Sequence, residues 1–259
     1  MNRQGDGKQL IAEAKKVFWL IVAPFFALVF LLGGPLPGGA AAGMGEGALL
    51  AAGLNRGQDM NQQNAEDGAD LIAAAQYGAR EIVAELLAQG VDPDFQNQEG
   101  NTALMAAAYH GHTEIAELLL DRGARVDIQN LKGETALTMA AYQGLIATAL
   151  LLSERGAQLD LQNEWGYTAL FGAAFADNTD MARLLIEQGA QLDIQDRRGQ
   201  TVLMITTIRG NTELAELLIA KGARLDIQTP DGTTALDLAL RTERQAIAEL
   251  IRAALAANP

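Results

Sequence analysis

The sequence of 259 residues has no cysteine, two histidines and a single serine, Ser153. The absence of cysteine excludes disulfide bonds, thiolate metal sites and cysteine nucleophiles. Ser153 has no histidine near it in the sequence. His110 and His112 flank Gly111, and no neighbouring turn offers the third ligand that a metal site requires. We therefore predict no enzyme, no metal site and no cofactor, and interpret His112 as a turn-stabilising residue and His110 as an exposed one.

The chain is also poor in positive charge, with 19 lysine and arginine residues against 32 acidic ones. Residues 1–42 carry four basic and two acidic residues, a formal charge of +2. The remainder carries 15 basic and 30 acidic residues, a formal charge of −15. So acidic a body repels a phosphate backbone, which excludes nucleic acid as a partner and favours a solubilising outer surface.

Long uncharged runs are rare, but residues 17–32 read VFWLIVAPFFALVFLL, without a charged or polar side chain. Basic residues precede this run and a small-residue pattern ending at Ala42 follows it, which is the order of a secretory signal. A cleaved signal peptide would end near Ala42. An uncleaved signal anchor would reach across a hydrocarbon core of about 30 Å once residues 33–36 extend its helix.

Both interpretations of residues 1–42 leave the basic flank in the cytoplasm and place everything after it across the membrane. We therefore predict a periplasmic protein, either soluble after signal cleavage or anchored in the inner membrane. Residues 43–64 are rich in glycine, glutamine and asparagine and predict a flexible linker. A buried soluble helix at 17–32 is disfavoured, because the repeats described next offer no pocket for it.

From residue 65 onward the sequence repeats with a period of 33 residues. The clearest copy, residues 97–129, reads NQEGNTALMAAAYHGHTEIAELLLDRGARVDIQ. The units occupy residues 65–96, 97–129, 130–162, 163–195, 196–228 and 229–259, of which the first and last are degraded. Glycine keeps register through them at Gly100, Gly133, Gly166, Gly199 and Gly232. Such a period predicts a solenoid, in which each unit buries its apolar face only by stacking on its neighbours.

Each unit predicts two short helices and an extended finger. In the clearest copy Thr102 stands as the N-cap of an alanine-rich helix, and Gly111 ends that helix. Thr113 is placed to cap a second helix over residues 114–122, which carries an apolar stripe at helical spacing. The residues that follow alternate between polar and apolar types, which favours an extended finger leading to the next unit.

The repeat resembles the ankyrin repeat, whose signature is Thr-Pro-Leu-His-x-Ala on the same period. The matching runs begin Thr102-Ala103-Leu104, Thr135-Ala136-Leu137 and Thr168-Ala169-Leu170. Over roughly residues 65–259 the resemblance implies an all-α solenoid of about six helix-turn-helix units with β-hairpin-like fingers, preceded by an N-terminal apolar helix. The signature histidine is replaced by Met105, Thr138, Phe171, Met204 and Asp237. We therefore expect the family's hydrogen bond between this histidine and the threonine to be absent throughout.

An aspartate also recurs once in each unit. The series is Asp94, Asp127, Asp160, Asp193 and Asp226. Calcium needs oxygen ligands at about 2.3–2.6 Å, whereas stacked helices lie about 8–10 Å apart, so adjacent units do not share an ion. We interpret these carboxylates as local turn caps.

Aromatic residues are few, and their positions give the functional prediction. Three recur every 33 residues at the end of the first helix, which in ankyrin-like stacks faces the concave groove. Two more fall on one fingertip beside that groove, and two arginines occupy the next fingertip. The rings either pack one unit on the next or bind a partner; aromatic residues and arginine are enriched at interface hot spots. The predicted partner-binding residues are Tyr109, Tyr142, Trp165, Tyr167, Phe175, Arg197 and Arg198.

The resemblance therefore implies a binding function. We predict an exported, non-enzymatic ankyrin-repeat protein that binds a partner protein through its concave aromatic groove and fingertips. One alternative is a periplasmic immunity or inhibitor protein that blocks a toxic enzyme, with an acidic surface suited to a basic target. Another is an accessory subunit of a larger membrane complex, held by residues 17–32 if the signal is not cleaved.

Overall fold

The structure is a computed structural model that describes residues 64–257, all within one compact unit of the chain. The apolar run at 17–32 and all of the predicted linker except its last residue lie outside the described residues. Among the described helices, none is long and apolar enough to cross a membrane.

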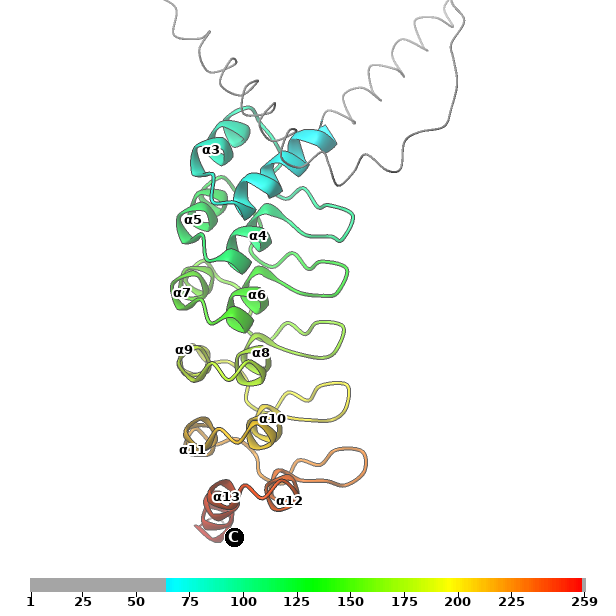
Figure 1. The fold of residues 1–259 in the computed structure, drawn as a ribbon, viewed down its shortest axis with the longest axis vertical. Coiled ribbons are helices and arrows are strands. Elements are labelled where there is room, and N and C mark those ends of the chain that lie inside the picture. Colours follow the sequence, from blue (N-terminus) through cyan, green and yellow to red (C-terminus); the bar gives the residue numbers. More distant parts are fainter. Residues whose placement is uncertain (1–63, 258–259) are drawn as a thin grey trace, which may run out of the picture. The chain divides into compact units, whose positions relative to one another are not determined.

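The described residues form a stack of helix pairs with loops projecting from one side (Figure 1). The inner row lies next to the loops and begins with helical residues 64–76. It continues with α4 (Ala103–His110), α6 (Ala136–Gln143), α8 (Ala169–Phe175), α10 (Val202–Arg209) and α12 (Ala235–Arg241). The outer row consists of α3 (Arg80–Ala88), α5 (Thr113–Asp121), α7 (Ile146–Glu154), α9 (Thr179–Glu187), α11 (Thr212–Ala220) and α13 (Gln245–Ala257). Helices of each row pack on the next of the same row, so the predicted all-α solenoid is confirmed.

Every labelled inner helix begins at a threonine whose hydroxyl accepts a backbone N–H three residues later. The cap predicted at Thr102 is thus confirmed, with the N–H of Met105 as its donor. Behind the cap, Ala107 and Ala108 are fully buried in α4. Such small residues let the backbones of successive inner helices approach closely. Three of the inner helices, α4, α6 and α10, end at a glycine in the left-handed conformation, such as Gly111.

The outer helix α5 starts one residue earlier than the sequence indicates and is capped differently. Its N-cap is His112, and no side chain caps it. The hydroxyl of Thr113 lies inside the first turn, 2.7 Å from the hydroxyl of Thr148 in the next outer helix. The prediction that Thr113 caps this helix is wrong, because a side chain within the first turn points across to the neighbouring unit.

Each finger ends in a tight turn that stacks on the next finger. The side-chain oxygen of Asn97 accepts the N–H groups of Glu99 (3.0 Å) and Asn101 (2.9 Å), which closes the first turn. The N–H of Leu131 in the next turn donates to the carbonyl of Glu99 at 3.0 Å. The fingers are therefore hairpin-like at their tips, although no residue within 64–257 is in a β-strand.

The stack is less regular at α10. Thr206 and Thr207 are both fully buried there, where the three preceding inner helices have alanine pairs. Thr207 donates its hydroxyl to the carbonyl of Leu203 at 2.7 Å, whereas the Thr206 hydroxyl has no partner among the described residues. The inner helices from α8 to α12 also pack less extensively on one another than those from α4 to α8, as the bulkier threonines predict.

Candidate functional site

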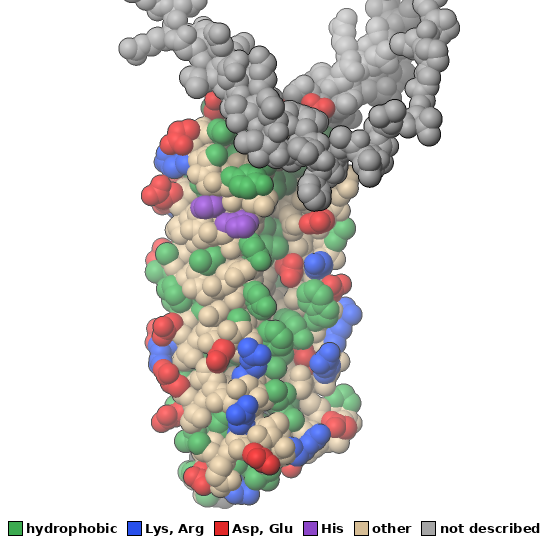
Figure 2. Space-filling view, viewed as in Figure 1, with side chains coloured by type: hydrophobic (Ala, Val, Ile, Leu, Met, Phe, Trp, Pro, Cys, Tyr) green, Lys and Arg blue, Asp and Glu red, His purple; other side chains and the backbone are tan. Residues whose placement is uncertain are grey.

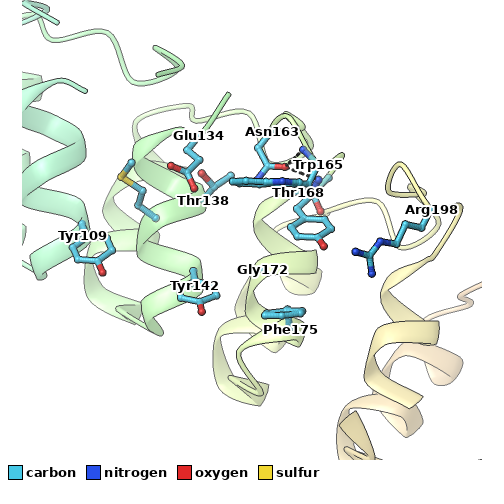
Figure 3. Close-up of a pocket in the computed structure, with 12 residues that line it drawn as sticks. Tyr109, Glu134, Thr138, Tyr142, Asn163, Trp165, Thr168, Gly172, Phe175 and Arg198 are labelled. Atoms are coloured by element: carbon cyan, nitrogen blue, oxygen red, sulfur yellow. Dashed lines mark hydrogen bonds between the residues drawn. The ribbon is translucent and has the colours of Figure 1, made fainter. Parts of the chain in front are cut away.

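The three aromatic residues that recur every 33 residues lie at the exposed ends of three inner helices. We call them the aromatic ladder, and their shared place in the repeat the ladder position. Tyr109 is the penultimate residue of α4, Tyr142 of α6, and Phe175 is the last residue of α8. Their side chains are 46%, 49% and 37% exposed, although the inner helices are otherwise largely buried. The ladder position therefore places a large ring at the surface in three consecutive units (Figure 3).

The fingertip beside the ladder is held by one asparagine. The side-chain oxygen of Asn163 accepts the N–H groups of Trp165 (3.0 Å) and Tyr167 (2.9 Å). Trp165 remains 43% exposed, whereas Tyr167 is half-buried and stacks on Phe171 with ring centroids 4.3 Å apart and an interplanar angle of 9°. The turn thus directs Trp165 toward the inner helices (Figure 3), and Tyr167 packs on α8 through Phe171.

The rings of Trp165, Tyr167, Phe175 and Tyr142 form a continuous series, whereas the ring of Tyr109 contacts His110 instead. Tyr167 lies 6.2 Å from both Trp165 and Phe175, and Phe175 lies 6.5 Å from Tyr142, measured between centroids. Packing between rings and exposure to a partner occur together here. Tyr142, Trp165 and Phe175 pack on other rings of the series and are also exposed, and Tyr109 is exposed without such a contact.

These rings line a groove of about 460 Å³ between the inner helices and the fingers (Figure 3). Its lining residues are Tyr109, Glu134, Thr138, Met139, Tyr142, Asn163, Trp165, Tyr167, Thr168, Gly172, Phe175 and Arg198. Gly172 contributes to the hollow, because the equivalent position holds a side chain in every other labelled inner helix, for example Met139 in α6. We call this surface the aromatic groove.

The two predicted arginines differ in position. Arg198 lines the aromatic groove and its side chain reaches from its fingertip toward the rings (Figure 3). Arg197 is exposed but does not line it, and its backbone N–H donates to the carbonyl of Trp165 at 3.0 Å. The structure therefore brings six of the seven predicted residues together and leaves the side chain of Arg197 out.

Other residues that line or border the groove were not predicted. The guanidinium of Arg209 lies 5.5 Å from the centroid of the Phe175 ring, a cation–π contact. Its sequence signal is that it follows the ladder position of the next unit by one residue. Glu134 and Tyr167 occupy the same position in successive units, so the 33-residue period also indicates Glu134. Gly172 has no comparable signal, since its contribution is an absent side chain.

The model of the family described as Ankyrin repeats (3 copies) matches the chain in overlapping stretches: 41–130, 71–163, 123–196, 147–228 and 170–258. The chain belongs to the ankyrin-repeat family. The crystal structure of an ankyrin repeat domain from Acinetobacter baumannii is similar, with 27% sequence identity and a TM-score of 0.67 over 71% of this chain and 97% of that one. No curated protein matches the sequence. Ankyrin repeats generally mediate protein–protein interactions, and no catalytic family is indicated.

The missing signature histidine of the ankyrin repeat is replaced in two units by another polar group. In α6, the hydroxyl of Thr138 accepts the backbone N–H of Thr135 at 2.8 Å. In α12, the carboxylate of Asp237 accepts the hydroxyl of Thr234 at 2.6 Å, and this bond holds the pKa of Asp237 below its usual value. Although the histidine itself is absent, a carboxylate in the last unit therefore makes the bond to the threonine that the histidine makes in the family.

Four of the five recurring aspartates link neighbouring ankyrin units rather than capping their own turns. Asp94 accepts the backbone N–H of Arg125 at 2.8 Å, and Asp127 accepts that of Gln158 at 3.0 Å. The same contact, 31 residues apart, recurs from Asp160 and from Asp193. For these four, the interpretation as local caps is wrong, because the free donors are at the start of the next finger. Asp226 instead accepts the side chain of Arg224, two residues before it, at 3.1 Å and 2.9 Å.

One of the two histidines, His112, also acts between units. His112 lies with its Nε2 3.1 Å from the carbonyl of Gln76 in the preceding unit, and Asn178 makes the equivalent contact with Tyr142 at 3.0 Å. The ring of His110 stacks near His112 at 6.1 Å. Over residues 64–257 there is no group of three histidine, aspartate or glutamate residues that could hold a metal ion.

Proposed function

We propose that this ankyrin-repeat protein is a non-enzymatic recognition protein that binds a segment of a partner protein in the aromatic groove. The observation that carries the proposal is the exposure of Tyr109, Tyr142, Trp165 and Phe175 around a hollow of about 460 Å³. Large rings exposed together around a concave surface are uncommon on a protein without a binding partner, and aromatic anchors dominate interface energies.

Removing two anchors tests this proposal. Tyr142→Ala together with Trp165→Ala deletes rings that are 49% and 43% exposed, so the helices keep their buried contacts. We expect the circular dichroism spectrum to be unchanged and partner affinity to fall at least a hundredfold, since each hot-spot ring contributes about 2 kcal/mol or more. Partners are identified by affinity purification on the full chain in detergent, and their dissociation constants are then measured. Unchanged affinity would refute the proposal.

Filling the groove provides the matched control for folding. A Cβ added at Gly172 would meet only Tyr142, at an ordinary 3.9 Å, so Gly172→Met introduces the side chain that α6 already carries at Met139. Replacing a helical glycine raises stability by about 0.5–1 kcal/mol. We expect this variant to be more stable than the wild type and yet to lose the partner, an outcome that loss of folding cannot produce.

We further propose that the repeats are exported and act in the periplasm, either after signal cleavage near Ala42 or anchored in the inner membrane. The support is the order of the basic flank, the apolar run at 17–32 and the small residues that follow. Protease added to spheroplasts should digest the repeats, and an intact mass distinguishes cleavage from retention. Digestion only after lysis would contradict export.

A further inference from the structure

The charge at one end of the aromatic groove is opposite to that of the chain. The formal net charge is −13, yet the end of the groove nearest α10 is bordered by Arg198 and Arg209. Both side chains are exposed, and neither forms an ion pair with a carboxylate within residues 64–257.

Arginines on the outer helices are placed differently. Arg155 pairs with Glu117 at 3.3 Å and with Asp121 at 2.8 Å, and Arg183 pairs with Glu213 at 2.8 Å. Figure 2 shows acidic side chains along this outer edge and basic ones beside the apolar stripe in the lower half of the stack. The charges of Arg155 and Arg183 are thus neutralised on the outer helices, whereas those of Arg198 and Arg209 are left available at the groove.

The ladder position itself changes from apolar to basic along the stack. After Tyr109, Tyr142 and Phe175 it holds Ile208 in α10 and Arg241 in α12. An occupant that follows the groove toward α12 therefore meets rings first and guanidinium groups afterwards.

Carboxylates in the units before and after α10 are hydrogen-bonded to neutral side chains. Asp177 accepts the side-chain amide of Asn211 at 2.6 Å. Asp231 accepts hydroxyl groups of Thr229 and Thr233, and these bonds hold its pKa below its usual value. Glu134, the acidic residue that lines the groove, accepts the amide of Asn130 at 3.0 Å and belongs to the unit of α6, two units before Arg198. Each of these carboxylates is thus bonded to neutral groups, and none forms an ion pair with Arg198, which lines the groove, or with Arg209, which borders it at Phe175.

We infer that the aromatic groove selects a protein segment in which an aromatic or aliphatic side chain is followed by a carboxylate. The apolar side chain packs on Tyr142 and Phe175, and the carboxylate is bound by Arg198 and Arg209. A guanidinium binds a carboxylate through two parallel hydrogen bonds, and one stacked on a ring keeps its edge free for this contact. The inference rests on the proposed function. A basic segment, which the acidic outer surface alone would suggest, is repelled at this end of the groove.

The probe is a library of random 12-residue peptides displayed on phage and selected on the full chain in detergent. We expect the peptides that bind the wild type, but not the Tyr142→Ala/Trp165→Ala variant, to combine an apolar residue with aspartate or glutamate. Arg198→Glu should weaken such a peptide at least tenfold. Replacing the peptide's acidic residue by lysine should restore binding to Arg198→Glu and abolish it to the wild type.

Arg197→Glu is the matched control, with the same charge change one residue away on a side chain that does not line the groove. At 0.15 M salt, where the Debye length is about 8 Å, we expect it to weaken binding less than about threefold. Groove-dependent peptides without acidic residues, or equal losses in both arginine variants, would overturn the inference while the proposed function stands. Failure to select any groove-dependent peptide would overturn both.

Discussion

At the scale of single residues, the two buried threonines of α10 differ by one hydrogen bond. Thr207 has a partner for its hydroxyl, the carbonyl of Leu203 at 2.7 Å, and Thr206 has none among the described residues. A buried hydroxyl without a partner costs about 1–3 kcal/mol. We therefore expect Thr206→Val, which keeps the shape and removes the hydroxyl, to raise the free energy of unfolding by about 1 kcal/mol, measured by urea denaturation.

The adjacent threonine supplies the control for that substitution. Thr207→Val makes the same chemical change at an equally buried position but removes a formed hydrogen bond, so the free energy of unfolding should fall by about 1 kcal/mol. Both variants changing in the same direction would show that the hydroxyl of Thr206 is not the source of the effect.

The aromatic groove shows which single residues a sequence can place. Tyr109, Tyr142 and Phe175 share one position of a repeated unit, so the period alone puts them on one line of the stack. Exposure was harder to predict: Tyr167 is half-buried because it stacks on Phe171, a contact within one unit that the period does not show. The depth of the groove depends on Gly172, where the sequence gives only a missing side chain.

At the scale of the elements, the period predicted the helices but not what joins one finger to the next. The donor that links each of the four inter-unit aspartates to the next finger is a backbone N–H, which every residue type except proline supplies, so no side-chain pattern marks it. A second series of contacts between fingers, made by glutamine side chains, is not marked in the sequence either, because the groups that they bind are backbone carbonyls. Gln129 donates its amide to the carbonyls of Gly133 (2.8 Å) and Gln162 (3.1 Å), and three other units repeat the contact.

The fingertip glycines test how closely the fingers are stacked. Gly133 has a φ of 75°, and a Cβ there would lie 2.9 Å from the Cα of Asn163 in the next finger. An alanine at position 133 in the left-handed backbone conformation costs about 1–2 kcal/mol. It would also weaken the hydrogen bond from the Glu164 N–H to the Lys132 carbonyl, now 2.7 Å. We expect Gly133→Ala to lower the free energy of unfolding by about 2–4 kcal/mol in urea.

Gly123 serves as the control, because it separates the cost of the left-handed backbone conformation from that of the close approach between fingers. Its φ is 91°, and a Cβ there would have nothing within 4 Å. Gly123→Ala should therefore cost only the left-handed term, about 1–2 kcal/mol. If the two glycine variants lose equal stability, the close approach of the fingers contributes nothing measurable.

At the scale of the whole repeat stack, the contacts between units are not uniform. The N–H groups of Leu131, Glu164 and Arg197 each donate to a carbonyl of the preceding fingertip, but the next residue in that series is Pro230, which has no N–H. This missing bond and the unpaired Thr206 hydroxyl both weaken the interfaces around α10. In a solenoid, stability is approximately a sum of unit and neighbour-interface contributions, so such weakness stays local.

Hydrogen exchange can locate this weakness. The α4–α5 and α10–α11 units each lie one unit in from an end of the described stack, so distance from an end alone would protect their amides equally. We expect the amides of α10 and α11 to exchange at least fivefold faster, because about 1 kcal/mol of interface stability is missing around them. Thr206→Val should slow their exchange about fivefold and leave α4 and α5 unchanged. Equal protection of both units would mean that the stack opens as one cooperative body, and the weakened interfaces would then lower the stability of all units together.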